Sequence, residues 1–177
     1  MNDLSMPNLY GTITQPATLT IERLLPGPIE RVWDYLTDSD LRRQWLASGD
    51  MELREGAPFS LTWRNDELTD PPGRRPEGSS SEHTLQSTIL AVDPPHSLAF
   101  TFGTAGEVRF TLTEKGRNVL LTVVHKRVPD RTVLLNVTAG WHTHLDVLAA
   151  RLEGKVPEPF WDEIARLKAE YETRLPA

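Results

Sequence analysis

Two histidines and a tryptophan stand close together near residue 140, in a segment with leucines at helical spacing. The residues that follow Trp141 at i+3, i+4, i+7 and i+11 are His144, Leu145, Leu148 and Leu152. They share one face of a predicted helix. A face that is apolar apart from one imidazole can close a hydrophobic pocket, where the imidazole orients a ligand or moves a proton. A hydrogen-bonded core histidine is the alternative interpretation of His144.

His142 differs from His144 in the direction in which it faces. Residues two positions apart in a regular helix project about 200° apart, so we expect His142 on the outer side, in contact with solvent. The two imidazoles therefore cannot bind one metal ion together. His125, on a predicted strand, can approach His144 across a cavity, but two ligands make a poor metal site. We expect no metal and no cofactor.

Other catalytic chemistry finds little support in the residue types. The chain has no cysteine, which excludes a thiol nucleophile, a disulfide scaffold and a thiolate metal site. The serines at 79–81 lack a G-x-S-x-G setting, and the chain has no glycine-rich phosphate loop. Asp34, Asp38 and Asp40 are predicted to be solvated helix ends. Acid–base work by His125 or His144 is the enzymatic alternative that stays open, with no residue assigned as catalytic.

Composition limits the class of protein and its partners. The chain has 177 residues, 25% of them charged and 38% hydrophobic, which is typical of a soluble globular protein. A net charge of −6 argues against a broad surface for nucleic acid or for an anionic membrane. No apolar run approaches the roughly 20 residues of a membrane span, and the first residues do not resemble a secretory signal. We expect a cytoplasmic protein, and both a monomer and a homodimer remain open.

The elements that must position the histidines can be found in the hydrophobic pattern. A strand is predicted over 18–25, followed by a helix over 29–36 and a shorter helix over 41–45. Six further segments carry strand signals, and they are 51–54, 59–63, 85–92, 98–102, 108–112 and 119–125. Consecutive strands joined by short turns predict an antiparallel meander.

Two helices are predicted to follow the sheet. The first begins after Asp130, a plausible N-cap, and runs to about Glu153, where Gly154 and Pro157 end it. The second is an extra terminal helix over 158–175. A strongly curved antiparallel sheet needs its concave face covered, and the long helix is the obvious cover. The expected fold class is therefore α+β.

The chain divides into an N-terminal extension, residues 1–17, and a single domain, residues 18–177. Within that domain residues 66–82 are rich in proline, glycine and serine, and they predict a flexible loop rather than a domain boundary. A tolerated surface insertion is the first interpretation of this loop. A lid over a pocket is the alternative, because unusually long loops often carry function.

Several stretches, in order, resemble a known family. They are LTIER (19–23), PIERVWDYLTD (28–38) with Trp45, VDPPHSLAFTF (92–102), LTVVH (121–125) and AGWHTHL (139–145) with Leu148 and 152–154. Together they resemble the Hsp90-ATPase-activator-like domains of the START/Bet v 1-like (SRPBCC) superfamily. The resemblance covers about residues 18–154. It implies a helix-grip fold: a curved antiparallel sheet of six to seven strands around a long C-terminal helix, with two short helices after the first strand.

The resemblance also implies a cavity between sheet and helix, but no single activity. The superfamily includes carriers of lipids and other hydrophobic molecules, polyketide cyclases, dioxygenase subunits and chaperone-activating domains. Binding of a small hydrophobic or aromatic ligand is the leading hypothesis. A cyclase-like or hydrolase-like enzyme that uses a cavity histidine is one alternative. A stress-related module that binds a chaperone partner is the other.

The residues expected around the ligand come from the long helix and from inward-facing aromatic positions of the strands. The candidates are Trp63, Phe100, Phe102, Phe110, His125, Trp141, His144, Leu145 and Leu148. Trp33 is expected to pack under the first helix, and Trp161 to hold the terminal helix in place.

Overall fold

A computed structural model of the protein, which describes residues 8–175, contains an antiparallel sheet of seven strands in the order β1-β2-β7-β6-β5-β4-β3. The strands are β1 (Thr12–Gln15), β2 (Thr18–Pro26), β3 (Pro58–Trp63), β4 (His83–Asp93), β5 (Ser97–Thr101), β6 (Glu107–Lys115) and β7 (Asn118–Lys126). The helices are α1 (Ile29–Thr37), α2 (Ser39–Arg42), α3 (Arg131–Glu153) and α4 (Phe160–Arg174), with a short 3₁₀-helix η1 (Asn65–Glu67). The predicted α+β helix-grip fold is confirmed.

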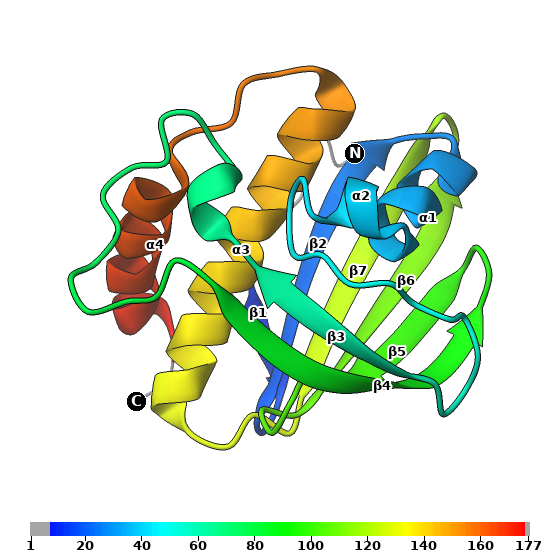
Figure 1. Ribbon diagram of the computed structural model, residues 1–177, viewed down its shortest axis with the longest axis horizontal. Coiled ribbons are helices and arrows are strands. Elements are labelled where there is room, and N and C mark those ends of the chain that lie inside the picture. The colour runs from blue at the N-terminus through cyan, green and yellow to red at the C-terminus, as the bar shows by residue number, and fades with distance from the viewer. Residues whose placement is uncertain (1–7, 176–177) are drawn as a thin grey trace, which may run out of the picture.

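The sheet curls around α3, and the other helices lie on either side of that pair (Figure 1). α4 packs against the outer side of α3, while α1 and α2 cover the opposite end of the sheet (Figure 1). None of the helices within residues 8–175 is long and apolar enough to cross a membrane.

The core lies between the concave face of the sheet and α3. Alternate residues of β6 and β7 are buried there, and Phe110 stands opposite Val123 in the register of the two strands. Trp141 and Leu145 of α3 belong to the same buried cluster. The period of two in the strands and the period of about 3.6 in the helix therefore meet in one apolar layer.

The ends of α3 follow from local side-chain chemistry. The carboxylate of Asp130 accepts a hydrogen bond from the N–H of Val133 at 2.9 Å, which caps the first turn. Gly154 ends the helix in the left-handed conformation, with φ of 70°. Both ends agree with the boundaries predicted from the sequence.

Two segments near the sheet edges differ from expectation. Residues 51–54 form no strand, because none of the strands within residues 8–175 pairs with them, and the N–H of Arg54 bonds to the carbonyl of Glu52 in a tight turn. The edge strand β3 instead makes an isolated bridge to Ser48 through Thr62. In the N-terminal segment, β1 pairs with β2 and thereby widens the sheet.

The corner between α1 and β3 is organised by a buried arginine. Arg42 is fully buried, and its guanidinium donates to the carbonyls of Leu36, Thr37, Ala47 and Gly49. Burial lowers the pKa of Arg42 to about 10, while nearby Asp38 and Asp50 favour its charged form. These bonds fix the turn that carries Trp45 and Leu46 toward α3.

The first half of the 66–82 loop is fastened to α4. The indole N–H of Trp161 donates to Asp66 at 2.7 Å, and its backbone N–H donates to the carbonyl of Pro72 at 2.9 Å. The hydroxyl of Thr69 accepts from the N–H of Phe160 at 2.9 Å. The loop therefore lies against the terminal helix over this part of its length.

Candidate ligand pocket

A pocket of about 340 Å³ lies where the first half of α3 faces the end of β3 and the start of β4. The residues that line it are Leu46, Trp63, Asn65, His83, Leu85, Phe102, Asn136, Val137, Gly140, Trp141 and His144. Its volume falls at the small end of the range for ligand sites, about 300–1,000 Å³. One small molecule can therefore occupy it.

Three aromatic side chains form one wall of the pocket. Trp63 and Phe102 meet edge to face, with ring centroids 5.6 Å apart. Phe102 and Trp141 are tilted against each other at 5.9 Å. Such pairs are stabilised by their quadrupoles in addition to the burial of their area. The wall is thus a connected aromatic surface that joins β3, the end of β5 and α3.

Trp141 is held in place by a buried histidine. Its indole N–H donates to Nδ1 of His125 at 3.0 Å. An indole nitrogen is only a donor, so Nδ1 is the acceptor and Nε2 carries the proton. Nε2 then donates to the carbonyl of Ala105 at 2.6 Å. Burial lowers the pKa of His125, and this neutral ring, with both nitrogens occupied, positions Trp141.

His144 is the other imidazole of the pocket, and only one of its nitrogens is occupied. Its Nδ1 lies 2.8 Å from the carbonyl oxygen of Trp45, which can only accept, so Nδ1 carries the proton. Phe160 of α4 packs on the ring at 4.9 Å. Burial lowers the pKa of His144 to about 4, which leaves Nε2 as an unprotonated acceptor near neutral pH. Within residues 8–175 no side chain or backbone group bonds to this nitrogen.

Gly140 lies one helical turn before His144 and also lines the pocket. A Cβ built on Gly140 would meet no atom outside its own helix and chain neighbours within 4 Å. The helix could therefore carry a side chain here without a clash. The absence of that side chain leaves space beside Trp141.

Some of the predicted cavity residues line the pocket, and the others lie deeper in the core. Trp63, Phe102, Trp141 and His144 line the pocket. Phe100, Phe110, His125, Leu145 and Leu148 are not among its lining residues and are at most 1% exposed. They face the same concave side but lie deeper, where Trp45 packs on Phe110 and Phe59 packs on Phe100.

The remaining lining residues were absent from the sequence-based set. Val137 and Gly140 precede Trp141 and His144 by four residues, and Asn136 precedes Gly140 by four, so helical spacing alone could have identified them. Leu46, Asn65, His83 and Leu85 come from connecting segments and the start of β4. Only the tertiary fold brings this second group to the pocket.

The expectation that His142 is solvated is wrong. His142 is 5% exposed because α4 covers this face of α3. The hydroxyl of Tyr171 accepts from the N–H of Gly11 at 2.8 Å and donates to Nδ1 of His142 at 2.7 Å. Burial, assisted by the positive charge of Arg23, lowers the pKa of His142 to about 3. This polar cluster joins the N-terminal segment to α4 and lies outside the pocket.

Comparison with known proteins identifies a sequence family for most of the chain. Residues 26–153 match the sequence model described as Activator of Hsp90 ATPase homolog 1-like protein. The matched region contains all of α3, whereas β1 and α4 lie outside it. No curated protein matches the chain.

Solved structures share the whole fold. The solution structure of the protein encoded by gene BPP1335 from Bordetella parapertussis is 39% identical, covers 97% of this chain and 93% of its own, and has a TM-score of 0.80. The crystal structure of CalU16 from Micromonospora echinospora is 25% identical, covers 94% of both chains and has a TM-score of 0.66. EF2215 from Enterococcus faecalis, a protein of unknown function, shares the fold at 20% identity, over 92% of this chain and 90% of its own, with a TM-score of 0.66.

Proposed function

The chain belongs to the Activator of Hsp90 ATPase homolog 1-like family, and from that premise we propose that it binds a small apolar or aromatic molecule in the pocket beside α3. The pocket has an aromatic wall of Trp63, Phe102 and Trp141 and aliphatic contributions from Leu46 and Leu85. Pockets of this composition bind ligands by burial of apolar area, with a few polar groups that fix orientation.

One observation carries the proposal: the glycine at position 140. A glycine within a helix costs about 1 kcal/mol relative to alanine, and Gly140 lies near the middle of α3. Because nothing would obstruct a Cβ there, packing gives no reason for a glycine. Open space for a ligand beside Trp141 does give a reason.

The two histidines favour binding over acid–base catalysis. His125 uses both ring nitrogens, because Nδ1 accepts from the indole N–H of Trp141 and Nε2 donates to the carbonyl of Ala105. His144 is a weak base near neutral pH, because burial lowers its pKa to about 4, and an effective general base has a pKa close to the working pH. Neither ring is therefore poised for proton transfer.

Side chains introduced at position 140 test the proposal. The neutral fluorophore N-phenyl-1-naphthylamine is titrated into the wild-type protein, Gly140→Ala and Gly140→Leu. We expect Gly140→Ala to raise the free energy of unfolding by about 1 kcal/mol and to weaken binding. The larger Gly140→Leu side chain should abolish most of the fluorescence gain. Thr132→Leu, on an exposed position of the same helix, serves as the matched control and should bind like the wild type.

Two outcomes would contradict the proposal. The first is unchanged fluorophore binding in a folded Gly140→Leu protein. The second is stimulation of an Hsp90 ATPase that Gly140→Leu leaves intact while no neutral aromatic probe binds, which would assign the function to the exterior of the protein.

A further inference from the structure

We propose that the molecule held in this pocket is a neutral aromatic compound that carries a hydrogen-bond donor, such as a phenolic hydroxyl, and that the donor bonds to Nε2 of His144. This inference depends on the binding function proposed above and specifies its ligand class. The inference rests on which polar atoms of the pocket already take part in hydrogen bonds and which do not.

The tautomer of His144 decides what the pocket can accept. The carbonyl of Trp45 accepts a hydrogen bond from the N–H at Nδ1, so Nε2 carries no proton and presents a lone pair. Phe160 packs on the ring, and the residue is only 6% exposed. A ligand that reaches this nitrogen replaces the water that would otherwise satisfy it, and only a ligand with an O–H or N–H group restores the lost bond.

The other polar groups around the pocket do not supply the missing donor. The indole N–H of Trp141 already donates to Nδ1 of His125. Asn65 also lines the pocket, and its Oδ1 is buried without a hydrogen-bond partner in the part of the chain that the structure describes. Two acceptors of the lining, Nε2 of His144 and Oδ1 of Asn65, therefore receive no hydrogen bond within the described residues, and a ligand with a donor can satisfy one of them, whereas an ether or a ketone cannot.

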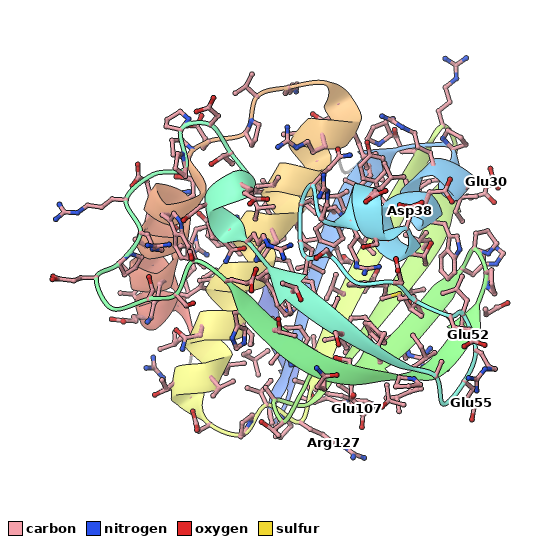
Figure 2. The ribbon with its side chains drawn as sticks, viewed as in Figure 1. Glu30, Asp38, Glu52, Glu55, Glu107 and Arg127 are labelled. Carbon is pink, nitrogen blue, oxygen red and sulfur yellow. The ribbon has the colours of Figure 1, made fainter. Side chains whose placement is uncertain are left out.

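The surroundings argue for a neutral ligand. No aspartate, glutamate, lysine or arginine is among the residues, within the described range, that line the pocket. Figure 2 shows the acidic side chains Glu30, Asp38, Glu52 and Glu55 around α1 and before β3, away from α4. A charged ligand would lose hydration in the pocket without gaining an opposite charge, whereas a protonated phenol would not.

The aromatic wall sets the shape of the ligand. Trp63, Phe102 and Trp141 form a continuous series of ring contacts along one side, and Gly140 leaves space beside them in the same pocket. A flat ring system can contact the wall while its hydroxyl points along α3 to His144. The chemistry is that of a hydroxylated aromatic ring rather than of a flexible fatty chain.

A matched pair of probes tests this inference. Calorimetric titration at neutral pH compares 2-naphthol with 2-methoxynaphthalene, which has the same rings but no donor. We expect 2-naphthol to bind about tenfold more tightly, the effect of one buried hydrogen bond. In His144→Asn the amide can still donate to the carbonyl of Trp45, but no atom replaces Nε2, so the two probes should bind equally. Leu85→Ala changes an apolar lining residue and should weaken both probes while their ratio persists.

The possible outcomes distinguish failure of this inference from failure of the binding function. Equal affinity of both probes for the wild-type protein would overturn the inference and leave the binding function intact. Absence of binding by both probes would overturn the two together. A tenfold preference that persists in His144→Asn would remove His144 as the acceptor.

A measurement on the unaltered protein covers a variant that does not fold. In protein with isotope-labelled histidine, the nitrogen NMR signal of Nε2 of His144 should move toward that of a hydrogen-bonded nitrogen when 2-naphthol is added. It should not move with 2-methoxynaphthalene. A signal that stays in place while 2-naphthol binds would overturn the inference.

Discussion

Replacement of Trp141 by phenylalanine will measure the hydrogen bond that positions the pocket wall. The bond spans 3.0 Å between Trp141, which is 3% exposed, and His125, which is fully buried. Without the indole N–H, Nδ1 of His125 is a buried acceptor with no donor, at a cost of about 1–3 kcal/mol. The smaller ring adds about 1 kcal/mol of lost packing, so we expect Trp141→Phe to lower the free energy of unfolding by about 2–4 kcal/mol.

A double-mutant cycle separates the bond from the packing. His125→Phe and the double variant are compared with Trp141→Phe by urea unfolding, followed by far-ultraviolet circular dichroism so that the signal does not depend on Trp141. Every variant with His125→Phe lacks the bond to the carbonyl of Ala105, so that loss cancels in the cycle. We expect a coupling free energy of about 1–2 kcal/mol. Effects that add to within about 0.5 kcal/mol would refute the assignment of His125 as the positioning residue.

Three further predictions concern the frame around the pocket. Arg42→Met leaves four carbonyls, two of them in buried bonds and two in partly buried ones, without their donor and should lower the free energy of unfolding by about 3–5 kcal/mol; a loss below about 1 kcal/mol would contradict this role. Burial lowers the pKa of His144 from 6.5 to about 4, so the unfolded chain takes up this proton at a higher pH than the folded protein does. The free energy of unfolding should therefore be greatest above about pH 6.5. It should fall by up to about 1.4 kcal/mol per pH unit as the pH is lowered toward about 4. Urea unfolding across this range should show a shallower decline in His144→Asn, and an unchanged slope would argue against a buried neutral ring. Trp161→Ala removes one anchor of the 66–82 loop and should speed trypsin cleavage after Arg74; an unchanged rate would show that this anchor does not restrain the loop.

The fold could be predicted because its pattern is local. Alternation in the strands, the N-cap at Asp130 and the stop at Gly154 are each determined by a few neighbouring residues, and the structure contains all of them. Residues 51–54 were predicted to be a strand but form none, because pairing depends on a partner that the segment itself does not specify. Local signals predict an extended segment more readily than its neighbour in a sheet.

The site could be predicted only in part, because depth and docking are tertiary properties. Helical spacing placed Trp141 and His144 on the face toward the sheet, where the structure has them. The same spacing placed His142 on the opposite face but could not show that Tyr171 of α4 covers it. Likewise, alternation predicted that Phe110 faces inward, but the packing of Trp45 that excludes it from the pocket was not visible in the sequence.

A map of where an aromatic molecule binds tests the proposed pocket most directly. Amide and indole NMR spectra are recorded while 2-naphthol is added to the wild-type protein. The largest shifts are predicted at the amides of Val137 and Gly140 and at the indole groups of Trp63 and Trp141, which line the pocket. Shifts confined to other surfaces, or no shifts up to the solubility limit of 2-naphthol, would contradict binding in this pocket.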